Sequence, residues 1–183
     1  MDRALVERAR TGDRDAYEAL ARASAPRLYL TAYRIVRDAD RAEDAVQQTL
    51  VTMWRELPSL RDPDRFEAWT YRLVLRFCLV ESRRARRTGV REVRLDALMP
   101  AVADAYADSD LRDQLDRALA RLTPEHRAVV VLHHYVGLPL SEIAEILGVQ
   151  YGTVGSRLHH ATRGLRAAIT AGDRSSVIGG QPA

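Results

Sequence analysis

The chain has 183 residues, and all 28 of its basic residues are arginine, set against 25 acids. Hydrophobic residues make up 46% of the sequence, which is ordinary for a globular protein of one domain or two small ones. No apolar run reaches the roughly 18 residues of a membrane span. Charges occupy residues 2–8, where a signal peptide is apolar, and the single cysteine, Cys78, excludes an internal disulfide. Together these features predict a cytoplasmic protein.

Helical periodicity dominates the chain, and no convincing strand or hairpin pattern interrupts it. Helices are predicted over residues 2–11 and 14–23, and Pro26 is expected to restart a helix at a first-turn position, where its missing N–H costs nothing. Residues 38–40 should break and cap the chain before a further helix over residues 40–57. The apolar stripe of that helix comprises Val46, Leu50, Met53, Trp54 and Leu57.

Prolines 58 and 63 bracket a polar loop, after which a long helix is predicted from about residue 65 to an arginine cluster at residues 83–87. Its inward side chains are expected to be Phe66, Trp69, Leu73, Phe77 and Val80, and Cys78 is expected to be buried.

A sharp reversal of charge follows the arginine cluster. Residues 65–94 hold 9 Arg and 3 acids, whereas residues 96–116 hold 6 Asp and 1 Arg. The acidic stretch lacks an apolar stripe, so we predict a flexible linker at residues 89–108 between domains at residues 1–88 and 109–171, with a tail at residues 172–183.

The last third begins with Thr123 as an N-cap and Pro124 at the first helical position, predicting a helix to about Val136. Ser141 is expected to cap a short helix over residues 142–147, which Gly148 ends. A final helix should start near Gly152 and fray after Thr170. Its inward residues are Val154, Leu158, Ala161 and Leu165.

Residues 143–158 fit a helix-turn-helix. Two closely crossing helices need a small residue, which Ala144 supplies, and the turn needs a left-handed residue, which Gly148 supplies. The helix from Gly152 is then free to enter a major groove, although a plain helical hairpin gives part of the same pattern. Its outer face offers Thr153, Ser156, Arg157, His159, His160 and Arg163.

Three segments here (LTPEHRAVV at 122–130, GLPLSEIAEILG at 137–148 and GTVGSRL at 152–158) resemble the −35-reading domain of extracytoplasmic-function sigma factors. These are the two-domain initiation subunits of bacterial RNA polymerase. Residues 40–54 resemble the helix with which that family binds the polymerase clamp, and residues 66–73, running into the arginine cluster, resemble its promoter-melting part. The resemblance covers about residues 14–168 in the right order.

The resemblance implies that Asp44, Gln47 and Gln48 face the clamp of the largest polymerase subunit. It also implies that residues 59–64, with Arg65, hold a flipped −10 base, and that the arginine cluster neutralises phosphates. Compensation of a helix dipole is the alternative for the cluster, but four arginines in five residues exceed what a cap needs. The −10 and melting residues are therefore expected to be Ser59, Arg61, Asp62, Arg65, Tyr71, Arg76, Arg83, Arg84, Arg86 and Arg87.

Some positions depart from the family pattern or stay open. Arg76 stands where the family commonly has Asn, and Gly155 and His160 stand where basic residues are frequent, so we expect a non-standard promoter or weaker DNA binding. Core packing is the favoured role of Trp69, whereas Tyr71 fits packing and base stacking equally. The linker is either an RNA mimic or a solvated spacer.

The predicted protein is thus all-α, with two small helical domains, and binds core RNA polymerase and promoter DNA, both duplex and single-stranded. No catalytic residues and no cofactor are expected. A metal site is not expected either, because adjacent histidines on a helix point about 100° apart and chelate poorly. The resemblance makes an anti-sigma factor an expected partner. A stand-alone helix-turn-helix regulator is the alternative. The absence of lysine fits GC-rich coding, or a need for arginine's bidentate fork, and only the placement of the arginines can separate the two.

Overall fold

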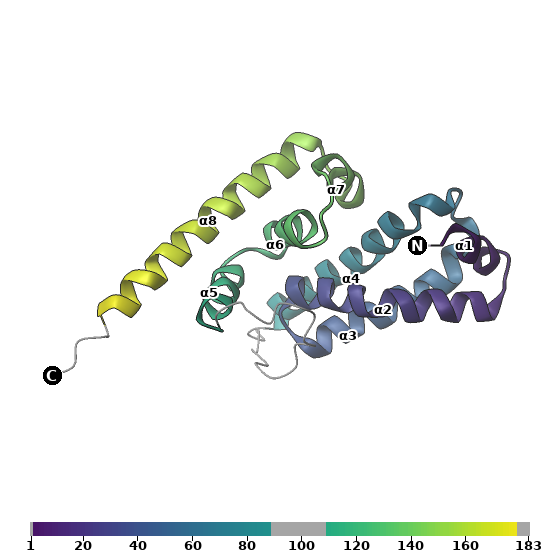
Figure 1. Cartoon of the computed structure of the whole chain (residues 1–183), viewed down its shortest axis with the longest axis horizontal. Coiled ribbons are helices and arrows are strands. Elements are labelled where there is room, and N and C mark those ends of the chain that lie inside the picture. Colours follow the sequence, from purple (N-terminus) through teal and green to yellow (C-terminus); the bar gives the residue numbers. More distant parts are fainter. Residues whose placement is uncertain (1, 89–108, 179–183) are drawn as a thin grey trace.

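The computed structural model describes residues 2–88 and 109–178, which form helices and turns without a strand. The N-terminal unit consists of α1 (Arg3–Arg10), α2 (Arg14–Val36), α3 (Ala39–Glu56) and α4 (Phe66–Thr88), with 3₁₀ turns at Leu57–Ser59 and Pro63–Arg65. The C-terminal unit consists of α5 (Ser109–Ala120), α6 (Pro124–Val130), a π turn (Val131–Tyr135), α7 (Leu140–Leu147) and α8 (Tyr151–Ile178). In Figure 1 the two units lie side by side, with α6 between α8 and α4. The all-α architecture of two small helical domains is therefore confirmed, while the predicted linker at residues 89–108 lies outside the described residues.

Aspartate caps start the first three helices. The carboxylates of Asp2, Asp13 and Asp38 accept hydrogen bonds from backbone N–H groups of the first turns of α1, α2 and α3. Each such cap stabilises a helix by about 1 kcal/mol. The predicted break at residues 38–40 is confirmed, and Arg37 ends α2 in the left-handed region, with a φ of 59°.

The predicted helix restart at Pro26 is wrong, because α2 runs without interruption through the proline. Pro26 lies on the exposed side of the helix. Leu20 and Leu28 are buried on either side of it. Their packing holds the helix together although an interior proline costs about 3 kcal/mol.

Two side chains expected in the core are exposed. Trp54 is 46% exposed and packs edge-on against Tyr17, with ring centroids 4.7 Å apart. Val80 is 48% exposed because the second half of α4 turns a different face inward. That face carries Val74 and Cys78, which belong to the core that joins α2, α3 and α4 to the C-terminal unit. The predicted stripe of α4 is confirmed for Phe66 and Leu73, which are buried, and for Trp69 and Phe77, which are half-buried against the cores; only Val80 is wrong.

The start and end signals of the C-terminal unit are mostly confirmed. The Thr123 hydroxyl accepts a hydrogen bond from His126 N–H at the start of α6, and Gly148 ends α7 with a φ of +64°. Ser141 does not cap α7, which begins at Leu140, two residues earlier than predicted and directly after Pro139. The expected fraying after Thr170 is wrong as far as Ile178, where α8 ends, and residues 179–183 lie outside the described residues.

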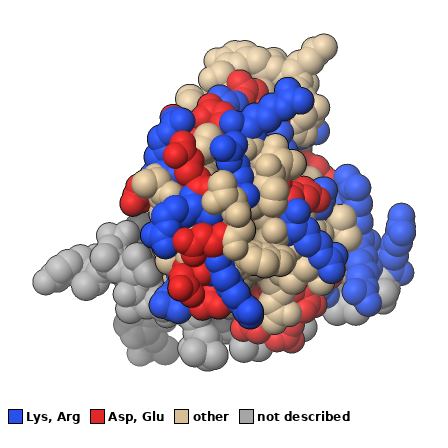
Figure 2. Space-filling model, turned by 90° about the vertical axis from the view of Figure 1, so that its right-hand side faces the viewer, with Lys and Arg blue, Asp and Glu red and all other residues tan. Residues whose placement is uncertain are grey.

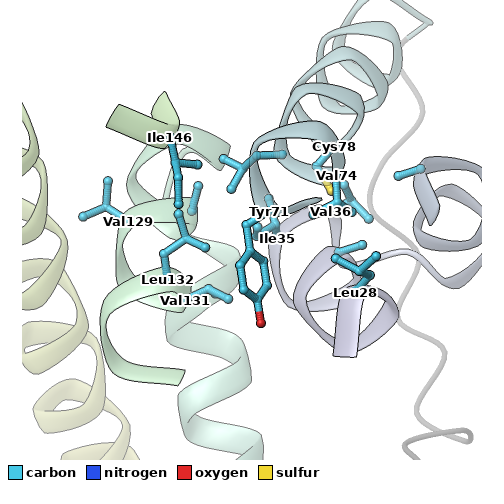
Figure 3. Close-up of a cluster of buried hydrophobic side chains, with 14 of the residues drawn as sticks. Leu28, Ile35, Val36, Tyr71, Val74, Cys78, Val129, Val131, Leu132 and Ile146 are labelled. Atoms are coloured by element: carbon cyan, nitrogen blue, oxygen red, sulfur yellow. The ribbon is translucent and has the colours of Figure 1, made fainter. Parts of the chain in front are cut away.

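A hydrophobic core joins the two units, which the sequence did not reveal. Figure 3 shows the Tyr71 ring between side chains of α2 and α4 on one side and the π turn and α7 on the other. Val36 and Val74 come from the N-terminal unit, and Leu132 and Ile146 come from the C-terminal unit. The described units therefore pack together as one body.

Candidate nucleic-acid and polymerase interface

The helix-turn-helix is formed by α7 and the first half of α8. Ala144 lies in the close crossing between the two helices and is buried, as are Ile143 and Val154. Val149 N–H donates to the carbonyl of Ala144 at 3.1 Å, which closes the turn after Gly148. The small residue and the left-handed glycine thus have the roles that the spacing predicts.

The outward face of α8 presents polar side chains. Ser156, His159, His160 and Arg163 are exposed, whereas Thr153 and Arg157 are half-buried. The Ser156 hydroxyl donates to the carbonyl of Thr153 at 3.1 Å. A Cβ atom built at Gly155 would meet no atom within 4 Å, so a side chain would fit at this position.

On α3, the three residues expected to bind polymerase are all exposed. Asp44, Gln47 and Gln48 project from the side opposite the buried Ala45 and Val46. Arg and acidic side chains are interspersed on the face of the molecule formed by the N-terminal unit, without a large patch of one sign (Figure 2). This mixture agrees with the neutral balance of residues 1–60, which hold 10 Arg and 10 acids. Contacts there must therefore depend on particular side chains rather than on a general field.

The loop between α3 and α4 is held by local hydrogen bonds. The Asp62 carboxylate accepts from Asp64 N–H at 3.0 Å, and the Arg10 side chain donates to the carbonyl of Leu60 at 3.2 Å. Ser59, Arg61 and Asp62 are exposed. Beside the loop lies a cleft of about 310 Å³, which residues Pro63 to Ala68 and Tyr71 line together with Leu138 and Glu142 of the C-terminal unit.

Several of the residues expected at the −10 element are not free in this arrangement. Arg65 forms an ion pair with Glu145 of α7. Tyr71 is 6% exposed, and the guanidinium carbon of Arg27 lies 5.2 Å from the centre of its ring. Tyr71 thus packs in the core between the units. Arg76 is exposed and lies over the Phe77 ring at 4.9 Å, and Trp69 is half-buried against the core of α1–α4.

The arginine cluster lies on the last two turns of α4. Arg83, Arg84, Arg86 and Arg87 are all exposed, and Arg86 pairs with Glu125 at 3.4 Å. Partial burial of Glu125 opposes its charged form, but hydrogen bonding to its own N–H and the charge of Arg86 outweigh that effect, so the pKa of Glu125 lies below its usual value. The Arg86–Glu125 contact therefore persists at neutral pH and is lost only as the pH falls through this lowered pKa.

The part of the chain that the structure describes offers no cluster for a metal ion, no reactive thiol and no membrane-spanning helix. Within residues 2–88 and 109–178, no three His, Cys, Asp or Glu side chains gather where they could hold a metal ion. Cys78 is buried, and burial raises the pKa of its thiol, so it is an inert core residue. None of the described helices is both long and apolar enough to cross a bilayer.

The sequence pattern did not predict the role of one residue, Arg127, in holding the two units together. Its guanidinium is 1% exposed and donates to four backbone carbonyls, those of Leu119, Ala120, Leu122 and Ile35. Three of these close the turn between α5 and α6, and the fourth lies at the end of α2, so Arg127 ties the units together. An arginine directly before an apolar run, Ala128 to Leu132, was the available signal.

Fold and site together define a helical two-domain transcription factor with a helix-turn-helix. Residues 20–88 match the family "Sigma-70 region 2", and residues 112–163 match "Sigma-70, region 4". The sigma factor SigL of Mycobacterium tuberculosis is 36% identical over 148 residues, which cover 78% of this chain and 82% of SigL. The chain therefore belongs to the extracytoplasmic-function (ECF) sigma factors of RNA polymerase, which are promoter-specific initiation factors and not enzymes.

Other relatives agree with this assignment. SigE of Mycolicibacterium smegmatis is 37% identical over 164 residues, which cover 85% of this chain but 63% of SigE. Among solved structures, CnrH in complex with the cytosolic domain of CnrY matches with a TM-score of 0.66 at 27% identity, covering 93% of this chain and 97% of CnrH. The sigma factor RpoE in complex with the anti-sigma factor NepR, from Bartonella quintana, matches with a TM-score of 0.67 at 25% identity, covering 84% and 96%. The region 2 match speaks against the alternative of a stand-alone helix-turn-helix regulator.

Proposed function

We propose that this ECF sigma factor docks on core RNA polymerase through the exposed face of α3, reads a −35 element with the first half of α8, and melts a −10 element with the N-terminal unit. The observation that carries the proposal is the helix-turn-helix with an exposed polar face on α8, joined to a region 2 unit whose α3 presents Asp44, Gln47 and Gln48 to solvent. We place the domains at residues 1–88 and 109–171 and the protein in the cytoplasm. An anti-sigma factor is a proposed partner, because both structural relatives described above were determined in complexes and one of these partners is named an anti-sigma factor.

The polymerase-binding assignment predicts that Asp44→Arg abolishes transcription. A cation with a long side chain at the centre of the docking face should weaken binding to core polymerase about a hundredfold or more, since misplaced charge at an interface costs several kcal/mol. Run-off transcription with purified core enzyme and a promoter selected by the wild-type protein measures the effect. Asp15→Arg, an equal charge change at an exposed position of α2, is the control. Wild-type activity of Asp44→Arg would remove the docking site from this face.

The −35 assignment predicts that Gly155→Arg tightens binding to duplex DNA. The position has open space around it, and an arginine there also removes the helix cost of glycine, about 1 kcal/mol. If the new side chain reaches a phosphate, the slope of log affinity against log salt should steepen by about 0.9. Binding of holoenzyme to a labelled −35 duplex at several salt concentrations tests this. An unchanged slope would place residue 155 away from the DNA.

The proposed contacts to the −10 element come from the loop and from α4: Ser59, Arg61, Asp62, Arg65 and Arg76. The arginine cluster is proposed to contact phosphates. Tyr71 can join them only after the two units separate, because its ring lies in the shared core. At the −35 element, the proposed contacts are Thr153, Ser156, Arg157, His159, His160 and Arg163.

A further inference from the structure

Tyr151 is the most exposed large apolar side chain among the residues that the structure describes. It is the first residue of α8 and is 60% exposed. The predicted start of this helix near Gly152 would leave Tyr151 in the turn, and it was not among the expected −35 contacts. In the structure it stands at the N-terminus of the proposed reading helix, where side chains contact base edges in a major groove.

The Tyr151 side chain makes no hydrogen bond and no ring contact with another described residue. Other exposed aromatic side chains do have neighbours. Trp54 packs edge-on against Tyr17. The guanidinium of Arg34 lies over the Tyr135 ring. Because a solitary exposed apolar side chain is common on protein surfaces, the position of Tyr151 must decide its role.

Hydrogen bonds of the turn hold the start of α8 in place. The left-handed Gly148 ends α7 three residues before Tyr151. The N–H groups of Thr153 and Val154 both donate to the carbonyl of Gln150, at 2.9 and 3.3 Å. In Figure 1, α8 begins beside α7 and extends away from it. The main chain at Tyr151 is thus fixed, so a contact restricts only the two torsions of its side chain, at a low cost in entropy.

Glycine at position 155 leaves one side of the Tyr151 ring uncovered. Residues i and i+4 are neighbours on a helix surface, and helical side chains lean toward the N-terminus. A side chain at position 155 would therefore lie against the Tyr151 ring. A Cβ atom at Gly155 would meet no atom within 4 Å, so no other described side chain fills this space. The ring is left open to a base.

The chemistry of the ring matches one group of the major groove. Residues 151–169 contain no Asp or Glu, so no carboxylate of this stretch repels DNA, and Arg157 and Arg163 supply positive charge for phosphates. Tyr151 is neutral and offers mainly apolar surface. The 5-methyl group of thymine is the apolar group that base pairs present in the major groove. The Tyr151 ring therefore complements thymine.

We propose that Tyr151 determines specificity at the −35 element by contacting the 5-methyl group of a thymine in the major groove. The inference rests on the proposed function, to which it adds an apolar contact beside the polar and basic ones. Contacts to base edges carry sequence information, whereas contacts to phosphates position the protein. Loss of the ring therefore relaxes the preference for one A·T pair.

The test removes the methyl group from the DNA and the ring from the protein. Holoenzyme formed with the full-length chain selects its preferred −35 duplex from a random library, and each thymine is then replaced in turn by deoxyuridine, which lacks only the methyl group. Tyr151→Ala removes the ring, and Tyr151→Phe keeps it without the hydroxyl. Leu115→Ala, which truncates an exposed apolar side chain of α5, is the matched control. Circular dichroism checks the fold of each variant.

We expect one deoxyuridine to weaken binding by the wild type about fourfold, the effect of one methyl-sized apolar group. Tyr151→Phe and Leu115→Ala should show the same loss. Tyr151→Ala should bind the unmodified duplex about three- to tenfold more weakly than the wild type and be insensitive to deoxyuridine, since the covered apolar area is gone.

Three results overturn the proposal: a selected duplex without an A·T pair, no effect of deoxyuridine at any position, or a sensitivity that Tyr151→Ala retains or Tyr151→Phe loses. Binding of the wild-type holoenzyme to the selected duplex, compared with a scrambled one, is the separate measurement for the proposed function. If that binding is specific, the −35 assignment stands whatever the result for Tyr151.

Discussion

Replacing Arg127 by leucine is expected to lower the free energy of unfolding by about 3–5 kcal/mol. The guanidinium is fully buried and donates to four carbonyls, and a hydrogen bond to a charged group contributes about 1.5–3 kcal/mol net, part of which the burial of the apolar leucine offsets. Leucine fills part of the volume but leaves the carbonyls at the ends of α2 and α5 without this donor. Urea denaturation followed by circular dichroism gives the change directly.

Two further variants sharpen the test. Arg121→Leu removes an exposed arginine from the same turn and should change stability by no more than about 0.5 kcal/mol. Arg127→Lys keeps the charge but replaces the planar fork with three donors on one nitrogen, so it should recover only part of the loss. A decrease below about 1 kcal/mol for Arg127→Leu would mean that water replaces the guanidinium and that Arg127 does not hold the units together.

Predictions that depend on a few neighbouring residues were mostly correct, the cap at Ser141 being an exception. The aspartate cap before α3, the Thr123 cap of α6 and the left-handed Gly148 each depend on hydrogen bonds or backbone sterics inside one turn. The neighbours of these positions in sequence are also their neighbours in space. The pattern around them is therefore sufficient.

Errors occurred where a distant segment decides the outcome. Pro26 stays inside α2 because buried leucines on both sides hold the helix, and Val80 is exposed because the C-terminal unit packs on another face of α4. Tyr71 fits either packing or stacking by sequence, and only the presence of α7 and the π turn buries it here. No periodicity within α4 contains that information.

The use of arginine as the sole basic residue has a structural role at particular positions. Arg127 uses its fork on four carbonyls, and the guanidinium of Arg34 lies over the Tyr135 ring, roles that an ammonium fills poorly. Most other arginines are exposed, and lysine could replace them. GC-rich coding thus remains the simpler origin of the composition, while individual positions make use of the guanidinium.

The arginine cluster at the end of α4 gives the second large prediction. Changing Arg83, Arg84, Arg86 and Arg87 together to glutamine should weaken promoter binding by the holoenzyme between about 100- and 1,000-fold at 0.1 M salt. Each phosphate contact contributes about 0.7–0.9 to the slope of log affinity against log salt, so four contacts account for about 3. Filter binding over a range of salt concentrations measures the slope, and permanganate reactivity of unpaired thymines measures melting.

The control and the alternative both make distinct predictions. Glutamine at the exposed Arg14, Arg22, Arg117 and Arg121 removes the same net charge elsewhere and should leave the slope within about one of the wild type. If the cluster only offsets the dipole of α4, the slope stays unchanged and the free energy of unfolding falls instead, by about 0.3–1 kcal/mol per residue. Holoenzyme is the appropriate species, because in the free protein one of the four arginines, Arg86, is already paired with Glu125.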